Sequence, residues 1–194
     1  MQAINRLLQK IETTLKSNLI EYEGSDYIFD YIHNVFKDKE IKISLNDERA
    51  NGQEALVNSA PWYVYNANYG TSEEKKFIDL FSRCYNALSN KYDAIYLIRN
   101  EREIKIYDNI GRAFEPDFLL FCKQREGERM TLQIFIESKG QHLLEHDKWK
   151  ADFLNEIRKK HYIIKTNTET YVITALPFYN YNNEHEFKRL FEVL

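Results

Sequence analysis

The stretch that decides the fold is FEPDFLLFC at residues 114–122, followed after a polar segment by TLQIFIESKG at residues 131–140. Residues 118–122 form an apolar run of strand length, and residues 131–139 predict a further strand, which Gly140 closes. Residues 125–129, centred on Gly127, predict a turn between the two runs. We therefore expect two strands that pair around this turn, with Pro116-Asp117 ahead of the first strand and Glu137-Ser138-Lys139 at the end of the second.

Charged side chains mark the ends of these two strands. Because side chains alternate along a strand, Glu137 and Lys139 are predicted to project from one face, and Ile136 and Ser138 from the other. If the strands pair, Asp117 and Glu137 occupy neighbouring positions and can converge on a metal ion. Charges within an otherwise apolar hairpin are costly unless they act together, which indicates a shared task.

These residue types suit the hydrolysis of a phosphodiester bond. That reaction needs a hard cation, an activated water and stabilisation of the charge that grows on the phosphate. Carboxylates supply oxygen ligands for Mg²⁺, with Mn²⁺ as a possible substitute, and Lys139 would add positive charge beside the water and phosphate. The spacing alone also occurs in unrelated charged chains, in which Glu137 and Lys139 are simply exposed neighbours at a strand end.

The rest of the pattern predicts an α/β fold in which helices flank a mixed β-sheet. Further strands are expected at residues 94–98 and 104–107, joined by a short charged turn, and at residues 171–176. A later helix is expected to contain Leu144, Trp149, Phe153 and Ile157. We expect residues 1–60 to form an N-terminal helix, at 4–19, with an extension, and residues 61–194 to form one domain.

A helix is predicted after Thr71 or Ser72, either of which can cap it. Its first turn holds Glu73 and Glu74, and apolar residues follow at helical spacing from Phe77 to Leu88. Acidic residues in a first turn are favourable in themselves, so this sequence leaves open a structural or a functional role for each of the two glutamates.

Length and composition limit the class of protein. The 194 residues suffice for one well-buried domain, and a 43% hydrophobic content is typical of a globular chain. The formal net charge of −3 gives no overall attraction to nucleic acid, so any DNA affinity must come from a local basic face or a partner. Isolated Cys84 and Cys122, with no membrane-spanning run and no signal peptide, predict a soluble protein of the reducing cytoplasm.

Several linked stretches resemble the C-terminal endonuclease domain of the restriction (Res) subunit of type III restriction enzymes, a member of the PD-(D/E)xK nuclease superfamily. The stretches are FEPDFLL at 114–120, IFIESKG at 134–140, HLL at 142–144 and DKWK at 147–150, with WYVYNANYG at 62–70 and SEEKKF at 72–77. The resemblance covers most of the chain after Glu21, and several motifs in order are more specific than Glu-x-Lys alone.

The resemblance implies a restriction-endonuclease-like fold and cleavage of double-stranded DNA. It implies that Asp117 and Glu137 bind Mg²⁺ and that Lys139 is the catalytic lysine. Superfamily members often add a carboxylate from the helix before the sheet, which points to Glu74, with Glu73 as the alternative. The implied partners are an ATP-dependent translocase region and a modification methyltransferase subunit of the same system. The chain has no Gly-x-x-x-x-Gly-Lys loop for such a motor, so it is either an excised domain or a stand-alone relative.

Other functions remain as alternatives. A stand-alone DNA repair nuclease or a catalytically inactive DNA-binding or assembly module would keep the same fold. His142, Glu145 and His146 have the spacing of one class of zinc peptidase, although few residues follow to complete such a site. Trp149 and Phe153 could stack on bases but are more typical of a core, and the basic run at 158–161 suits either DNA phosphates or a helix C-terminus.

Overall fold

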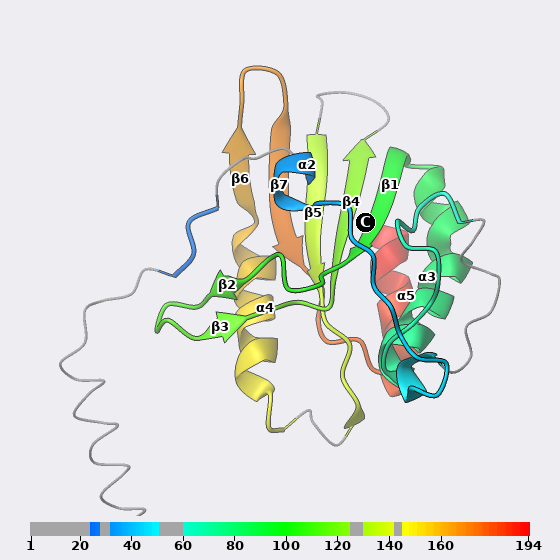
Figure 1. Ribbon diagram of the computed structural model, residues 1–194. Helices are drawn as coiled ribbons and strands as arrows, with labels where there is room; N and C mark the ends of the chain where they lie inside the picture. The colour runs from blue at the N-terminus through cyan, green and yellow to red at the C-terminus, as the bar shows by residue number, and fades with distance from the viewer. Residues whose placement is uncertain (1–23, 28–31, 51–59, 125–129, 142–144) are drawn as a thin grey trace, which may run out of the picture. The chain divides into compact units, whose positions relative to one another are not determined.

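The computed structural model describes residues 24–27, 32–50, 60–124, 130–141 and 145–194 (Figure 1). The chain divides into two compact units, one made of Met1–Asp26 and Ile106–Phe114 and the other of Tyr27–Lys105 and Glu115–Leu194. The helix expected at 4–19 and the turn expected at 125–129 lie outside the described residues. The larger unit holds every residue of the expected site.

The larger unit is built on a five-stranded sheet with the strand order β1-β4-β5-β7-β6 (Figure 1). The strands are β1 (Tyr92–Arg99), β4 (Phe118–Gln124), β5 (Met130–Ile136), β6 (Tyr162–Lys165) and β7 (Thr170–Ala175). All neighbouring pairs are antiparallel except β5 and β7, which are parallel. The sheet is therefore mixed, which confirms the predicted α/β class and is compatible with a restriction-endonuclease-like fold.

Helices flank this sheet. The longer helices are α3 (Ser72–Ser89), α4 (Lys148–Lys160) and α5 (Glu184–Val193), and short helical segments are α2 (Ile32–Val35), η1 (Glu48–Ala50) and η3 (Tyr181–Asn183). Helix α3 packs against α5 and β1, whereas α4 packs against β7 (Figure 1). Helix α4 lies in the connection from β5 to β7, as the crossover between two parallel strands requires.

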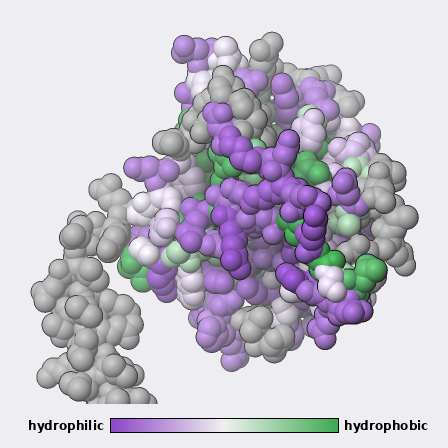
Figure 2. All heavy atoms as spheres, in the orientation of Figure 1, coloured by the Kyte–Doolittle hydropathy of each residue, from purple (hydrophilic) through white to green (hydrophobic). Residues whose placement is uncertain are grey.

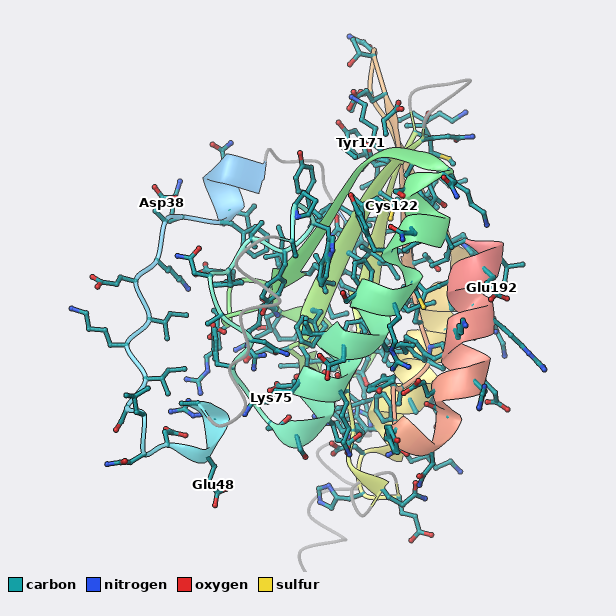
Figure 3. All side chains as sticks on the ribbon, turned by 90° about the vertical axis from the view of Figure 1, so that its right-hand side faces the viewer. Asp38, Glu48, Lys75, Cys122, Tyr171 and Glu192 are labelled. Atoms are coloured by element: carbon teal, nitrogen blue, oxygen red, sulfur yellow. The ribbon has the colours of Figure 1, made fainter. Side chains whose placement is uncertain are left out.

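Strand β4 lies inside the sheet and is covered on both faces. Its first five residues, Phe118 to Cys122, are all buried, as expected for a continuous apolar run. Figure 3 shows Cys122 on this part of the sheet, beyond α3. Cys84 of α3 is buried as well, and both cysteines are free thiols, which agrees with their prediction as isolated core residues.

An aromatic cluster joins α3, β4 and α5. Phe77 of α3 contacts the rings of Phe118, Tyr179 and Phe187 at centroid distances of 5.0, 5.3 and 6.0 Å. Phe187 also packs against Phe191 at 5.6 Å. Contacts of this kind add to the free energy gained from burial, so the cluster anchors the two helices that frame one side of the sheet.

The structure corrects three predictions about neighbouring segments. Residues 94–98 and 104–107 do not form a hairpin, because β1 pairs with β4 along its whole length. Residues 104–107 instead contribute β2 (Ile106–Tyr107), which pairs with β3 (Ala113–Phe114) in the smaller unit. The strand predicted at 131–139 ends at Ile136. Beyond it the chain leaves β4, and Glu137 and Lys139 exchange backbone hydrogen bonds with Tyr179, each at 2.8 Å.

Tyr179 and Tyr181 lie among asparagines, a composition typical of a surface loop, but this interpretation is wrong for Tyr179. The Tyr179 side chain is fully buried, whereas Tyr181 is 55% exposed. Tyr179 reaches the core because rings from α3 and α5 pack around it. The sequence near Tyr179 does not reveal these contacts. Helix α5 and strand β6 were not predicted.

The smaller unit consists, in its described part, of the β2–β3 hairpin and residues 24–26. The hairpin turn is closed by Asp108, which accepts hydrogen bonds from the backbone N–H groups of Ile110 and Arg112 at 3.0 and 2.8 Å. Ser25 pairs with Tyr107 through both its backbone and its hydroxyl group. No helix in the described part of the chain is long and apolar enough to cross a membrane.

Figure 2 shows that hydrophilic residues cover most of the described surface in that view. Near the start of α3, Lys75 donates a hydrogen bond to the backbone oxygen of Glu48 at 3.1 Å, and Figure 3 labels both residues. Just after the end of α3, Lys91 donates a hydrogen bond to the backbone oxygen of Glu192 in α5, which Figure 3 also labels. The first contact holds the start of α3, and the second links the segment after α3 to α5.

Candidate active site

The pairing of β4 with β5 places Asp117 beside Glu137. Phe118 is the register partner of Ile136, so Asp117 comes directly before β4 at the point where Glu137 comes directly after β5. The Asp117 N–H donates to Glu137 Oε2 at 3.1 Å, and the Ser138 N–H donates to Asp117 Oδ2 at 2.8 Å. The Glu137 carboxylate is thus held by the backbone of Asp117, and the Asp117 carboxylate by the backbone of Ser138, so the structure places the two acidic residues side by side.

The two carboxylates occupy a poorly solvated position. Glu137 is only 2% exposed and Asp117 is partly buried. Burial raises the pKa of Asp117 well above its usual value, and repulsion from Glu137 and Glu74 raises it further. Burial also raises the pKa of Glu137, although Lys139 partly offsets this effect. Crowded carboxylates of this kind are the groups that a bound cation would stabilise.

Lys139 supplies positive charge at the same place. Its ammonium nitrogen Nζ lies 2.8 Å from Glu137 Oε1 and 3.0 Å from Asp147 Oδ2, and its side chain is 14% exposed. Burial lowers the pKa of Lys139, but its pairs with Glu137 and Asp147 outweigh burial and hold the pKa above the usual value. The side chain therefore remains charged at any physiological pH.

Asp147 is a member of the site that the sequence analysis missed. It lies just before α4, and its Oδ2 accepts from Lys139 and also lies 3.4 Å from Nζ of Lys150. Although burial opposes the change, hydrogen bonds from Lys139 and His146 lower the pKa of Asp147 to about 2. The only signal in the sequence is an acidic residue ahead of a helix, which ordinarily indicates a cap.

Glu73 and Glu74 point to different surroundings. Glu73 Oε2 accepts from the Tyr181 N–H at 3.2 Å, and its Oε1 lies 3.3 Å from Lys76 Nζ. Repulsion from Glu74 raises the pKa of Asp117, so Glu74 is the glutamate that acts on this carboxylate. Glu74 also closes the predicted cap of α3, since Glu74 Oε2 accepts from the Thr71 N–H at 2.6 Å.

Arg99 fixes the Glu74 side chain from the sheet. An Arg99 nitrogen lies 2.7 Å from Glu74 Oε2, and the two side chains are 11% and 12% exposed. Arg99 also donates to Glu101 Oε1 at 2.9 Å and to the Tyr69 backbone oxygen at 2.9 Å. A charge-assisted network of this kind, largely out of water, holds Glu74 in one orientation beside the site.

Gly70 makes room for that network. Its φ of +130° is one that L side chains rarely adopt, and an added Cβ would lie 2.3 Å from Glu74 Oε2 and 2.7 Å from the Arg99 guanidinium. We expect Gly70→Ala to lower the free energy of unfolding by about 2 kcal/mol or more, because backbone strain and the displaced ion pair act together. Urea unfolding measures the loss. In a Glu74→Ala background the part that comes from the Glu74 contact should disappear, and an unchanged loss would contradict this account.

The donor set suits a hard divalent cation. The Asp117 and Glu137 carboxylates are close enough to repel each other, and within the described residues only the Ser138 N–H donates to the Asp117 carboxylate. Oxygen ligands from one or two carboxylates are the kind that Mg²⁺ takes while it keeps several waters. Within the same described ranges, no group of three or more His, Cys, Asp and Glu side chains is close enough to hold a metal.

Other residues singled out in the sequence fall outside this cluster. His142 and Leu144 lie outside the described residues. His142 is the first residue of the zinc-peptidase pattern, so the structure does not test that pattern. His146 is highly exposed and lies 3.2 Å from Asp147 Oδ1. Phe153 is buried in the core, as the simpler prediction held, while Trp149 is partly exposed. Residues 158–161 are exposed at the C-terminal end of α4, where basic side chains are favourable.

Comparisons with known proteins identify a family. Residues 17–193 match the model of the family HI_1054_C, described as a C-terminal domain, and the chain belongs to this family. A protein of Haemophilus influenzae, described as uncharacterized, is 36% identical over 142 residues, which are 68% of this chain and 31% of that protein. The chain thus spans about a third of the length of the curated relative it matches. No solved structure matches the chain.

Proposed function

We propose that this chain is a metal-dependent endonuclease domain of a type III restriction-modification system, which hydrolyses phosphodiester bonds of double-stranded DNA. The observation that carries the proposal is the convergence of Asp117, Glu137 and Lys139 where β4 and β5 meet. The same three residues lie within the linked stretches that resemble the PD-(D/E)xK nuclease domains of such systems. Localisation in the cytoplasm is part of this proposal.

Asp117 and Glu137 are the proposed ligands of Mg²⁺, for which Mn²⁺ could substitute. The raised pKa of each carboxylate supports this assignment, because a cation would offset both burial and mutual repulsion. The ion would supply an activated water and charge stabilisation at the phosphate. Lys139 is proposed to place its ammonium group beside the phosphate, where a permanent positive charge stabilises the charge that develops during hydrolysis.

Glu74 is the proposed third carboxylate. Its effect on the pKa of Asp117 favours it over Glu73, which is occupied by Tyr181 and Lys76. Arg99 neutralises much of the Glu74 charge, so Glu74 is proposed to act on the metal less directly than Asp117 and Glu137. The capping contact with Thr71 fixes its position in either role.

The proposed partners are an ATP-dependent translocase region and a modification methyltransferase subunit. The Haemophilus influenzae relative is about three times as long as the stretch that matches this chain, so further regions accompany the domain in that protein. In such a system the methyltransferase reads the DNA sequence, and the nuclease needs little base specificity of its own.

Plasmid cleavage tests the proposal. Supercoiled DNA should be nicked or linearised by the chain in Mg²⁺ or Mn²⁺ and left intact in EDTA. DNA binding without cleavage, unaffected by EDTA, would indicate an inactive binding module of the same fold. No binding and no cleavage in any metal would contradict the proposal for the isolated chain.

Cleavage by the isolated chain should be weak, unspecific and sensitive to salt. The net charge of −3 provides no general attraction to DNA, so local phosphate contacts must hold the substrate. For a handful of such contacts, affinity should fall by about tenfold or more between 50 and 200 mM salt, following the release of counterions. Fluorescence anisotropy with two unrelated duplexes measures this dependence, and tight, sequence-selective binding would contradict it.

A further inference from the structure

Asp147 occupies a helix-capping position without capping the helix. Aspartate at the residue before a helix usually accepts a hydrogen bond from a backbone N–H two or three residues later. Asp147 makes no such side-chain bond to α4. Its Oδ2 lies instead 3.0 Å from Lys139 Nζ and 3.4 Å from Lys150 Nζ, and the residue is buried. The other carboxylate oxygen, Oδ1, lies 3.2 Å from Nδ1 of the exposed His146, so it is Oδ2 that contacts the two lysines.

Lys139 forms ion pairs with two carboxylates that come from different parts of the fold. Glu137, at the end of β5, lies 2.8 Å from Lys139 Nζ, and Asp147, ahead of α4, lies 3.0 Å from it. A lysine stem is flexible, and a single ion pair leaves it several orientations. Glu137 is also a proposed metal ligand. If a cation bound the Glu137 carboxylate, it would weaken the attraction between Glu137 and Lys139. The contact with Asp147 would then hold the ammonium group.

We propose that Asp147 is a positioning residue that fixes the orientation of the Lys139 side chain for phosphodiester hydrolysis. The inference rests on the proposed nuclease function. Lys150 belongs to the same arrangement, since its ammonium group lies in the first turn of α4, where positive charge is unfavourable unless an acid such as Asp147 offsets it. Asp147 thereby links two lysines to the carboxylate pair.

The test compares Asp147→Ser with wild type. Serine keeps the capacity to cap α4 and removes the carboxylate, so a purely structural role at the helix start would be preserved. Asp147→Glu restores the charge, and Asp147→Asn replaces the serine variant if that variant does not fold. Glu156→Gln is the matched control, because it breaks the Glu156–Lys160 ion pair at the far, exposed end of the same helix.

Two measurements follow each variant. One is the NMR signal of the Lys139 side chain in protein carrying ¹³C-labelled lysine, identified by its loss in Lys139→Arg. The other is the kcat and KM of metal-dependent cleavage. In Asp147→Ser the Lys139 signal should become narrow and mobile, and kcat should fall about tenfold to a hundredfold with KM nearly unchanged, as expected for lost positioning. Asp147→Glu should partly restore the Lys139 signal and kcat. Glu156→Gln should change neither the Lys139 signal nor kcat.

Three outcomes would overturn the inference. The Lys139 signal could stay unchanged in Asp147→Ser, kcat could remain within a factor of about two, or KM alone could rise, which would make Asp147 a contributor to substrate binding only. Absence of metal-dependent cleavage by wild type defeats the proposed function instead. The Lys139 signal, which is recorded without substrate, then still decides whether Asp147 orders this lysine.

Discussion

Lys139→Ala is expected to reduce metal-dependent DNA cleavage by about two or more orders of magnitude, the usual loss when an electrostatic contributor worth several kcal/mol is removed. Lys139 is the positive group closest to the carboxylate pair, at 2.8 Å from Glu137. Its loss also removes the ammonium group that pairs directly with the buried Glu137 carboxylate. Asp117→Ala should have an effect of similar size. Single-turnover cleavage of a plasmid in saturating Mg²⁺ measures both.

Lys160→Ala is the matched control for the lysine. Lys160 also forms an ion pair with a carboxylate, at 2.5 Å from Glu156, but it lies exposed at the far end of α4. Its replacement should leave cleavage unchanged. Thermal melting shows whether each variant is folded. A folded Lys139→Ala protein that cleaves DNA at the wild-type rate would remove this lysine from the reaction.

Local sequence pattern predicted the part of the fold that carries the site. The run at 118–122 is apolar throughout and the run at 134–136 is apolar as well, because these parts of β4 and β5 are buried inside the sheet, and such strands stand out in a sequence. Once these strands pair, the neighbourhood of Asp117 and Glu137 follows from the register alone. Their proximity was therefore predictable, while their role remains a prediction.

The missed parts depend on contacts between distant segments. Strand β6 is short and lies at the edge of the sheet, and its apolar run, at 162–164, has only three residues, too few to indicate a strand. The burial of Tyr179 requires the ring of Phe77 in α3, which is distant in the chain, together with that of Phe187 in α5. The contact of Asp147 with Lys139 likewise arises only when α4 begins beside the end of β5, and an acid before a helix does not reveal it.

Asp117→Asn is expected to leave the thermal stability in EDTA unchanged or to raise it, while it abolishes cleavage. The raised pKa of Asp117 means that folding disfavours its charged form, through burial first and repulsion from Glu137 second. A carboxyl group whose pKa is higher in the folded state makes the protein less stable as the pH rises from the unfolded pKa to the folded one. Asparagine removes that penalty and can still accept the Ser138 N–H.

The pH dependence provides a control for this reasoning. In EDTA the melting temperature of wild type should fall as the pH rises from about 4, where an unfolded aspartate titrates, toward neutrality, and Asp117→Asn should show a smaller fall. Glu137, whose pKa is also raised, should account for part of the fall in melting temperature that remains in Asp117→Asn. Melting in EDTA at several pH values measures both proteins under the same conditions.

Metal binding should raise the melting temperature of wild type, because a cation offsets the repulsion between Asp117 and Glu137. An ion that binds only the folded protein stabilises it by about 2.7 kcal/mol at a hundredfold excess over the dissociation constant. In a domain of this length each kcal/mol corresponds to roughly 2–4 °C, so Mg²⁺ or non-catalytic Ca²⁺ should raise the melting temperature by several degrees. Asp117→Asn should lose most of this shift. If the variant instead melts many degrees below wild type in EDTA, Asp117 is mainly a structural acceptor for Ser138, and the metal site built on it fails.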